Sequence, residues 1–515
     1  MGAQRGGGIR LFREGGLSGE AKAGPKSGQR YMNASVGWAQ RAESIVPWRI
    51  SRSSAGDLVA VVLGASVAVA IGAAVVVNPL LAVLPAATLA GIVLLVDARA
   101  RILFLVFGGF LVLQSSESLG SLKLVYLAGV FASLGGALFR FSQGEDRFAR
   151  GLARPLMRVS VAISTLLVIS LLVAGAHGIP GTDSLRDIAP YVLFACAPVF
   201  AIDAARAFSH RALVRLLVSA GILATLSFTI TWLEQRQIAQ LAFSKFALSS
   251  FYLPAALFVY ATASALHRNH HRIRWASLSV LVFALMLSTG TRQILILAIA
   301  PIVVVISARR RTSSRFIRLA LGGPVAVVLM LSVAYLVLAA THASSTQITD
   351  RITILKNTGT PADASYHDRQ AETRDAARIF YANPVFGAGP GTSFHWISAN
   401  GTPTSAFVLD SPVDFPAKFG IAGLVVVAFL VVSYGSFLRS ALRFNHPRTE
   451  TLALAGYFGV AIAGSLLMTP LEDKGLGFGL ILLLALVFRT WPPAAALPPA
   501  TRTESDGSWI GDESR

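Results

Sequence analysis

One arginine lies in a short loop of a kind that elsewhere in the chain contains few arginines. Arg292 belongs to LSTGTRQILIL (287–297), a hairpin with almost no loop between two apolar segments. A charge at a membrane boundary is costly unless it faces a cavity or an anionic partner, or snorkels to lipid phosphates. Because a guanidinium holds its N–H donors in a fixed fork, it suits bidentate binding of an anion. Arg292 is therefore a candidate anion ligand, with lipid snorkelling as the simpler alternative.

Three more arginines lie in a polar segment further along the chain. In YHDRQAETRDAARIFYA (366–382), Arg374 and Arg378 are one helical turn apart, and Arg369 comes slightly more than a turn earlier. The apolar residues recur at near-helical spacing, which predicts a helix. This helix should end at Asn383, because a residue that precedes proline is pushed out of the helical region. A surface helix is the simple interpretation, and a face that binds an anion is the alternative.

The turn that follows, NPVFGAGPGTSF (383–394), has glycines at alternate positions, namely Gly387, Gly389 and Gly391. Glycine permits a positive φ and a close approach of the backbone to a ligand. The same residues could instead form a hinge between a polar loop and a membrane domain. We expect the glycines to contact a substrate, and the hinge stays as the alternative.

Groups that could accept a proton lie in the same region. Asp410 and Asp414 of FVLDSPVDFPAKFGIAGLVVV (407–427) approach the next apolar segment, and His395 lies earlier in the loop. A carboxylate or an imidazole within hydrogen-bond reach of a hydroxyl can act as a general base. The nine histidines show no metal-ligand spacing, and the single cysteine, Cys196, excludes a disulfide or a Cys metal site. No metal and no cofactor are expected.

The composition places these candidates in a membrane protein. Hydrophobic residues make up 54% of the sequence and charged residues only 14%, an apolar excess that a soluble domain could not keep from water. Apolar runs of roughly 17 to 24 residues match the length that a helix needs to cross about 30 Å of hydrocarbon. The sequence predicts an all-α, polytopic membrane protein with about 12–14 transmembrane helices and one large extracytoplasmic loop. The runs are 57–77, 80–96, 101–115, 121–139, 157–175, 187–204, 211–232, 247–266, 274–289, 293–308, 317–340, 419–438, 451–469 and 475–489.

The net charge of +19 follows the membrane topology. Alternate loops carry most of the arginines, and the loops between them are nearly free of Lys and Arg, which is the positive-inside pattern. This pattern places the N- and C-termini in the cytoplasm and the large loop outside, and it argues against nucleic-acid binding. The arginines assigned to the cytoplasmic side include Arg99, Arg101, Arg140, Arg154, Arg206, Arg211, Arg272, Arg310, Arg439 and Arg448.

The expected regions differ in composition. The two tails are polar and low in complexity, which is typical of disorder. The regions are a disordered basic cytoplasmic tail (1–56), a membrane domain of about 11 spans (57–340), the large extracytoplasmic loop with short helices (341–417), the C-terminal spans (418–489) and a second cytoplasmic tail (490–515).

In this setting the motifs resemble those of the O-antigen ligase and O-antigen polymerase superfamily of bacterial membrane glycosyltransferases. Its members carry an (S/T)GSR hairpin between two spans, which here reads STGTR with Arg292. Their large periplasmic loop has an arginine, a helix and an NPxxGxGxGxF turn, and here these are Arg369 and NPVFGAGPGTSF. An HN or DN dipeptide and GxxGL follow, and here Asp410, Ser411 and GIAGL (420–424) take those positions.

The resemblance covers about residues 285–430 by motif and the rest of the chain by topology. It implies inverting, metal-independent glycosyl transfer at the outer face of the bacterial cytoplasmic membrane. The donor would be an undecaprenyl-pyrophosphate-linked glycan, and the acceptor a hydroxyl of another glycan or lipid. Arg292 and Arg369 would stabilise charge on the leaving pyrophosphate, and Asp410 would take the proton of the acceptor hydroxyl. The further substrate-binding residues would be Arg374, Gly387, Gly389, Gly391, His395 and Asp414.

Several alternatives stay open. Ligases of this family have a histidine just before the Asn of the dipeptide, whereas this chain has Leu409 and then Asp410, which favours a polymerase-like enzyme without excluding a ligase. A flippase or transporter of lipid-linked oligosaccharides would have as many helices, although such proteins often show internal repeats and ionisable groups near the midplane. Asp203 lies near the cytoplasmic end of its span, so we expect it to be a cap or an arginine partner. A structural subunit without chemistry is the third possibility.

Overall fold

The structure, a computed structural model, covers the chain in segments. It describes residues 79–113, 121–143, 147–235, 250–267, 271–288, 292–308, 364–398, 401–407, 411–444, 448–466 and 469–491. The chain divides into two compact units, residues 1–86 and 87–515. Of the first unit only the beginning of one helix is described, and all other described elements belong to the second unit.

Helices dominate the described part of the chain, as the sequence predicts. Helices lie within each predicted apolar run except 57–77 and 317–340, which lie outside the described residues. The elements are α3 (Pro79–Val96), α4 (Ala98–Leu103), η1 (Phe104–Gly108), α5 (Gly109–Val112), α6 (Ser121–Gln143), α7 (Arg147–Ala176), α8 (Gly181–Ala207), α9 (His210–Gln235), α10 (Tyr252–His267), α11 (Arg272–Ser288), η3 (Arg292–Ala298), α12 (Ile299–Ala308), α15 (Ala364–Ala382), β1 (Phe394–Ile397), β2 (Pro403–Ala406), α16 (Asp414–Phe444), α17 (Thr449–Gly464), η5 (Pro470–Glu472) and α18 (Lys474–Thr490).

Length and composition support a membrane protein. Within the described segments, 5 helices are long and apolar enough to cross a bilayer. Their apolar stretches are Lys123–Ser142, Ala153–Ala176, Gly181–Ala207, His210–Thr231 and Asp414–Arg443. The full number of spans stays a prediction from the sequence.

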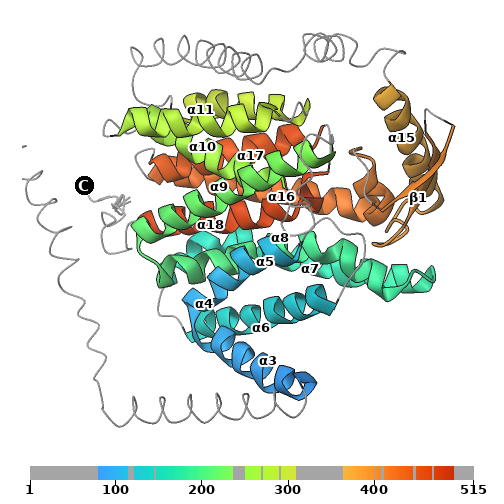
Figure 1. Ribbon diagram of the computed structural model, residues 1–515, viewed down its shortest axis with the longest axis horizontal. Coiled ribbons are helices and arrows are strands. Elements are labelled where there is room, and N and C mark those ends of the chain that lie inside the picture. The colour runs from blue at the N-terminus through green and yellow to red at the C-terminus, as the bar shows by residue number, and fades with distance from the viewer. Residues whose placement is uncertain are drawn as a thin grey trace, which may run out of the picture. The chain divides into compact units, whose positions relative to one another are not determined.

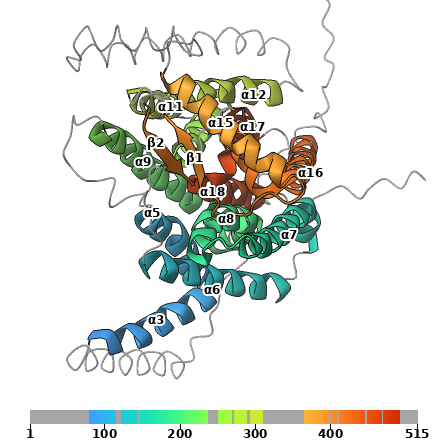
Figure 2. The same ribbon diagram turned by 90° about the vertical axis from the view of Figure 1, so that its right-hand side faces the viewer.

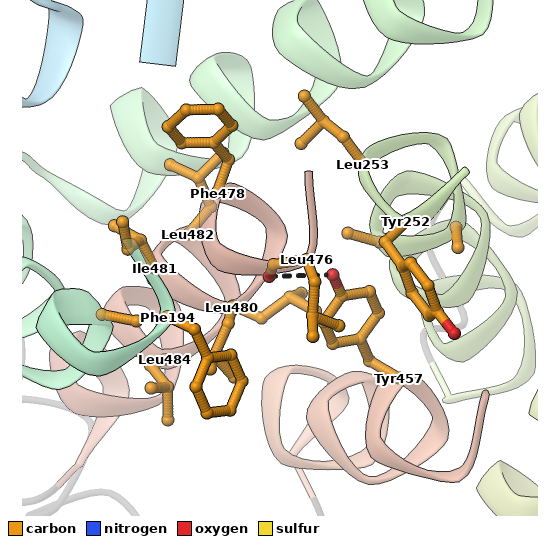
Figure 3. Close-up of a cluster of buried hydrophobic side chains, with 14 of the residues drawn as sticks. Phe194, Tyr252, Leu253, Tyr457, Leu476, Phe478, Leu480, Ile481, Leu482 and Leu484 are labelled. Carbon is orange, nitrogen blue, oxygen red and sulfur yellow. Dashed lines mark hydrogen bonds between the residues drawn. The ribbon is translucent and has the colours of Figure 1, made fainter. Parts of the chain in front are cut away.

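The helix α8 forms the centre of the bundle. Of its apolar stretch 94% is buried inside the protein, against 33% for that of α16. It packs along α18 and α7, and α10 and α17 pack on the other side of α18 (Figure 1). Figure 3 shows the contact region, where Phe194 of α8 lies among leucines of α18 and the Tyr457 hydroxyl donates a 3.1 Å hydrogen bond to the Leu476 carbonyl.

The helices end on two sides of this bundle. On one side, the arginine end, the start of α9 meets the start of α17, where His210 Nε2 lies 2.9 Å from Glu450 Oε1. On the other side, the loop end, Asp473 ahead of α18 accepts hydrogen bonds from Ser250 Oγ (2.5 Å) and Phe251 N (3.0 Å) ahead of α10. The helix α15 and both strands lie at the loop end, which faces the viewer in Figure 2. Which end faces the cytoplasm stays a prediction from the charge pattern.

The expected role of Asp203 is confirmed at the arginine end. Its carboxylate binds the fully buried guanidinium of Arg101, with Nε–Oδ2 at 2.9 Å and Nη2–Oδ1 at 3.0 Å. Arg101 Nη1 also donates to the carbonyls of Leu94 and Leu95. This bidentate pair joins α4 to α8, so Asp203 is an arginine partner.

A short β-hairpin follows the glycine turn, and the all-α expectation did not include it. β1 and β2 pair antiparallel, with Phe394 opposite Ala406. Each strand has only four residues, too few for an alternating pattern to stand out. The hairpin depends on tertiary contacts, because Phe394 is buried against Ala376 of α15 and Ala417 of α16. The predicted helix at 366–382 is confirmed as α15, which ends at Ala382.

Candidate functional site

The glycine turn is joined to α16 by its backbone. α16 is interrupted at Gly420, whose φ of 62° and ψ of −161° are not helical. This break exposes peptide groups on both sides of it, and such groups need partners when they are buried. The turn supplies them through four hydrogen bonds: Ala388 N to Ala417 O (2.9 Å), Gly389 N to Lys418 O (3.0 Å), Ile421 N to Pro384 O (2.8 Å) and Ala422 N to Val385 O (3.0 Å).

The three glycines of the turn all have positive φ, at 72° for Gly387, 97° for Gly389 and 84° for Gly391. A Cβ on Gly387 would lie 2.3 Å from the carbonyl group of Lys418 in α16. On Gly389 and Gly391 it would lie 2.7 Å from backbone atoms of α7 and α8. The close approach that these glycines permit is therefore to the protein's own helices. This packing supports the alternative, a joint between loop and bundle, and substrate contact at the glycines stays a prediction.

A buried charge network lies beneath this turn. Lys418 Nζ is 3.1 Å from Asp187 Oδ1, 3.2 Å from Asp414 Oδ1 and 2.7 Å from Glu472 Oε1. All four side chains are at most 4% exposed. Tyr191 donates from its hydroxyl to Glu472 Oε1 at 2.9 Å, and the turn joins the network where the peptide N–H of residue 391 donates to Asp187 Oδ2 at 2.8 Å.

The network holds three carboxylates and one ammonium, an excess of two negative charges if all are ionised. Burial, together with the nearby carboxylates of Asp414 and Asp187, raises the pKa of Glu472 well above its ordinary value, although Lys418 opposes this shift. Glu472 also interacts directly with Asp414. A proton held between these two carboxyl groups removes one of the excess charges.

The predicted acidic residues fall in different places. Asp410 lies outside the described residues. Asp414 belongs to the closed network below the turn, where its side chain is 0% exposed. Sequence reasoning missed Asp187, Lys418 and Glu472. One signal was available, because Asp414 and Lys418 are four residues apart at the start of an apolar helix, the spacing of an ion pair.

The side chains of α15 and β1 have different environments. Arg369 is partly buried, Arg374 is exposed, and the side chain of His395 is exposed. Arg378 donates to Asp375 Oδ1 at 2.6 Å with a guanidinium that is 75% exposed. The other oxygen of Asp375 accepts the backbone N–H of His395 at 2.8 Å and so ties α15 to β1.

One face of α15 contacts the described residues just ahead of α16. Thr373 Oγ1 lies 3.0 Å from the Oγ of Ser411, the residue directly after Asp410. Arg369 is one turn before Thr373 and shares its face of the helix. The Ser411 carbonyl also accepts a hydrogen bond of 3.2 Å from Thr469 Oγ1, just ahead of η5. The fold thus brings the α15 face, the start of α16 and the segment ahead of η5 together.

Arg292 is the first residue of η3, which packs against α11 and α17. Its side chain lies outside the described part of the chain. The expected pairing of Arg292 with Arg369 around one anion therefore stays a prediction.

An apolar groove runs from the loop end along the bundle. It has a volume of about 310 Å³ and lies between α16, α17 and α18, with Leu424, Val431 and Ile462 among its lining residues. Its lining also includes Pro412 and Thr469, which are next to Ser411 and to the connection that carries Glu472. The groove therefore meets the polar loop end next to Ser411.

Comparison with known proteins leaves the family open. No protein-family model matches the chain, and no curated protein matches it in sequence. The resemblance to the O-antigen superfamily therefore rests on the sequence motifs alone.

We expect Gly387→Ala to destabilise the protein far more than Gly178→Ala. Both glycines have a φ near +70°, but nothing lies within 4 Å of a Cβ at Gly178 (φ 73°), whereas Gly387 (φ 72°) faces the Lys418 carbonyl group at 2.3 Å. The left-handed conformation costs both variants about 1–2 kcal/mol. The melting temperature of the detergent-solubilised variants measures the difference, and equal losses would contradict the backbone joint.

We expect Lys418→Met to cost about 3–5 kcal/mol, because it leaves buried carboxylates without their cation. Arg378→Met removes an exposed partner of Asp375 and should cost about 1 kcal/mol or less. Equilibrium unfolding of both variants in the same detergent tests this contrast. Similar stabilities would mean that Lys418 does not hold the loop end together.

We expect a pH dependence that comes from Glu472. Its folded-state pKa lies above the unfolded value, so the stabilisation is full below the unfolded pKa and is lost as pH rises through the folded pKa. Stability should fall with rising pH in wild type and fall less in Glu472→Gln, which stays neutral. Melting temperatures across neutral pH provide the measurement. Parallel curves for the two proteins would show that Glu472 is not the group that causes the pH dependence.

Proposed function

We propose that the protein transfers a glycan from an undecaprenyl-pyrophosphate-linked donor to an acceptor hydroxyl at the outer face of the cytoplasmic membrane, as O-antigen polymerases and ligases do. The observation that carries the proposal is the meeting of an apolar groove with a charged, loop-covered end of the bundle. A lipid-linked glycan has the same division, with an isoprenoid chain, an anionic pyrophosphate and a polar sugar.

The groove suits the lipid part of such a donor. Its volume of about 310 Å³ is at the lower end of small-molecule sites. Leu424 and Ile462 also present apolar surface beside it, at 44% and 42% exposed, on helices that the bilayer surrounds. A chain lying there would place its head group near Thr469 and Ser411.

The polar part would meet the loop. Arg369 shares a helix face with Thr373, and Thr373 contacts Ser411. Arg369 is therefore suited to bind the pyrophosphate from the side of α15. Arg292 starts η3, and the resemblance gives it the same task. Arginines aimed at the leaving group stabilise the charge that develops there as the glycosidic bond breaks.

The chemical step is a single displacement. The acceptor oxygen attacks the anomeric carbon and forms a new C–O bond, while the C–O bond to the pyrophosphate breaks and its electron pair leaves with the phosphate oxygen. Asp410 accepts the proton of the acceptor hydroxyl. Attack opposite the leaving group inverts the anomeric centre. The glycine turn and the Lys418 network position the loop above the groove and do not take part in the chemistry.

The test is the length and attachment of envelope glycan in cells that lack the protein. The null strain is complemented with wild type, Arg292→Ala, Arg369→Ala or Asp410→Asn, each checked for expression. Arg378→Ala is the matched control, because it removes an exposed arginine from the same helix as Arg369. We expect the three site variants to lose activity by at least 100-fold, a typical effect of removing one transition-state donor, and the control to behave as wild type.

The product that accumulates separates the candidate activities. Single repeat units on the carrier in the null strain and the site variants would indicate a polymerase. Full-length polymer that stays on the carrier would indicate a ligase. Normal glycan in every variant, with a defect only in the null strain, would overturn the catalytic assignment and favour a flippase or transporter.

A further inference from the structure

The glycine turn has a second surface, which is apolar and exposed. Tyr381 at the end of α15 is 78% exposed, and in the turn Val385 is 57% and Phe386 42% exposed. Pro384 between them is exposed as well, whereas residues 387–391, directly after them, are buried. Large apolar side chains gathered on one exposed surface indicate contact with a protein or a membrane. We call this surface, residues 381–386, the apolar tip.

The apolar tip is fixed beside two helices that can cross a bilayer. The Ile421 N–H of α16 donates to the Pro384 carbonyl at 2.8 Å, so the tip lies level with the residues directly after the break in α16. On its other side the turn packs on the end of α7, where a Cβ on Gly389 would lie 2.7 Å from the backbone of Ala174. Both α7 and α16 have apolar stretches of membrane-spanning length.

The lengths of these two helices place the tip at an edge of the hydrocarbon. No charged residue follows Arg158 in α7, and none lies between Lys418 and Arg439 in α16. Arg439 comes 18 residues after Ile421, which is about 27 Å along the helix. Arg158 comes 16 residues before Ala174, which is about 24 Å. Since the hydrocarbon is about 30 Å thick, arginines at one membrane interface put the tip at the other.

The apolar surface of the tip continues along both helices. Ile421, Val425 and Val432 of α16 are exposed and share one face of the helix. Val168 and Leu172 of α7 are exposed as well, and α7 packs against α16. Exposed apolar side chains over the length of a spanning helix are the side that lipid contacts. The tip is therefore the loop-end part of a lipid-facing surface.

We propose that the apolar tip inserts into the bilayer at the loop end and binds the loop to lipid. Tyr381 suits this position, because a tyrosine at a membrane interface keeps its ring in an apolar environment and its hydroxyl in water. Val385 and Phe386 extend the apolar surface of α16 to the level of the head groups.

This contact has a consequence for the helix that precedes the tip. The helix α15 lies at the loop end (Figure 2) and runs directly into the tip, so insertion of the tip holds α15 at the membrane surface. A ligand of the face that carries Arg369 and Thr373 would then be bound at that surface. The inference itself rests on the packing of the turn, and it holds for an enzyme and for a transporter alike.

The experiment measures the depth of the tip in a bilayer. Full-length protein with Cys196→Ala carries a nitroxide label on Phe386→Cys, Val432→Cys or Ser405→Cys, and is placed in nanodiscs of phosphatidylethanolamine and phosphatidylglycerol. Electron paramagnetic resonance compares collisions of the label with oxygen, which concentrates in hydrocarbon, and with a water-soluble nickel chelate. We expect the label at 386 about 5–10 Å below the head-group level. It should be shallower than the label at 432 and deeper than the label at 405 on the β-hairpin.

A charge at the tip tests the same contact. Phe386→Asp puts a carboxylate at the membrane interface, where it must keep its water, and Ile397→Asp puts one on an exposed apolar position of β1. With the label on Val385→Cys, we expect Phe386→Asp to shift the label toward water and to raise its collisions with the chelate. Ile397→Asp should leave the depth of the label unchanged.

Three results would overturn the proposal. The first is a label at 386 that meets the chelate as often as the label at 405. The second is a label at 386 that is shielded from both reagents, because a partner protein or a second copy of the chain would then cover the tip. The third is an equal shift of the label at 385 in Phe386→Asp and Ile397→Asp.

Discussion

Lys418 Nζ lies within 3.2 Å of carboxylates from α8, α16 and η5, and the loop end depends on this contact. Taking an ammonium and its partners out of water is costly, and close geometry with further hydrogen bonds is needed to offset that cost. Tyr191 and the peptide N–H of Gly391 supply such bonds. Because the partners come from α8, α16, η5 and the turn, the network is complete only when these elements are assembled together.

The turn and the break in α16 are two halves of one joint. Gly420 interrupts the helix next to Lys418, and the peptide groups freed by the break are bonded to residues 384–389 of the turn. The backbones approach too closely for a Cβ on either side. Since β1 follows the turn directly and Asp375 ties it to α15, this joint sets the position of the whole described loop above the bundle.

This arrangement creates a boundary between two kinds of environment. Below it, the groove between α16 and α17 is apolar. Above it, α15 carries Arg369 and Arg374, and the Arg186 guanidinium of α8 is stacked on the Phe407 ring at 3.7 Å. The proposal of a lipid-linked anionic substrate rests on this boundary together with the motifs.

The sequence alone determined the helical class, the limits of most helices and the place of α15, because apolar run length and proline chemistry are local. The sequence also indicated that Asp203 would be a helix cap or an arginine partner, and it pairs with Arg101. It did not reveal that the glycines face other helices or that Asp187 and Glu472 meet Lys418. Those facts join residues that are distant in the chain, such as Asp187 and Glu472, and buried charge is stable only where such partners converge. Tertiary structure alone could decide them.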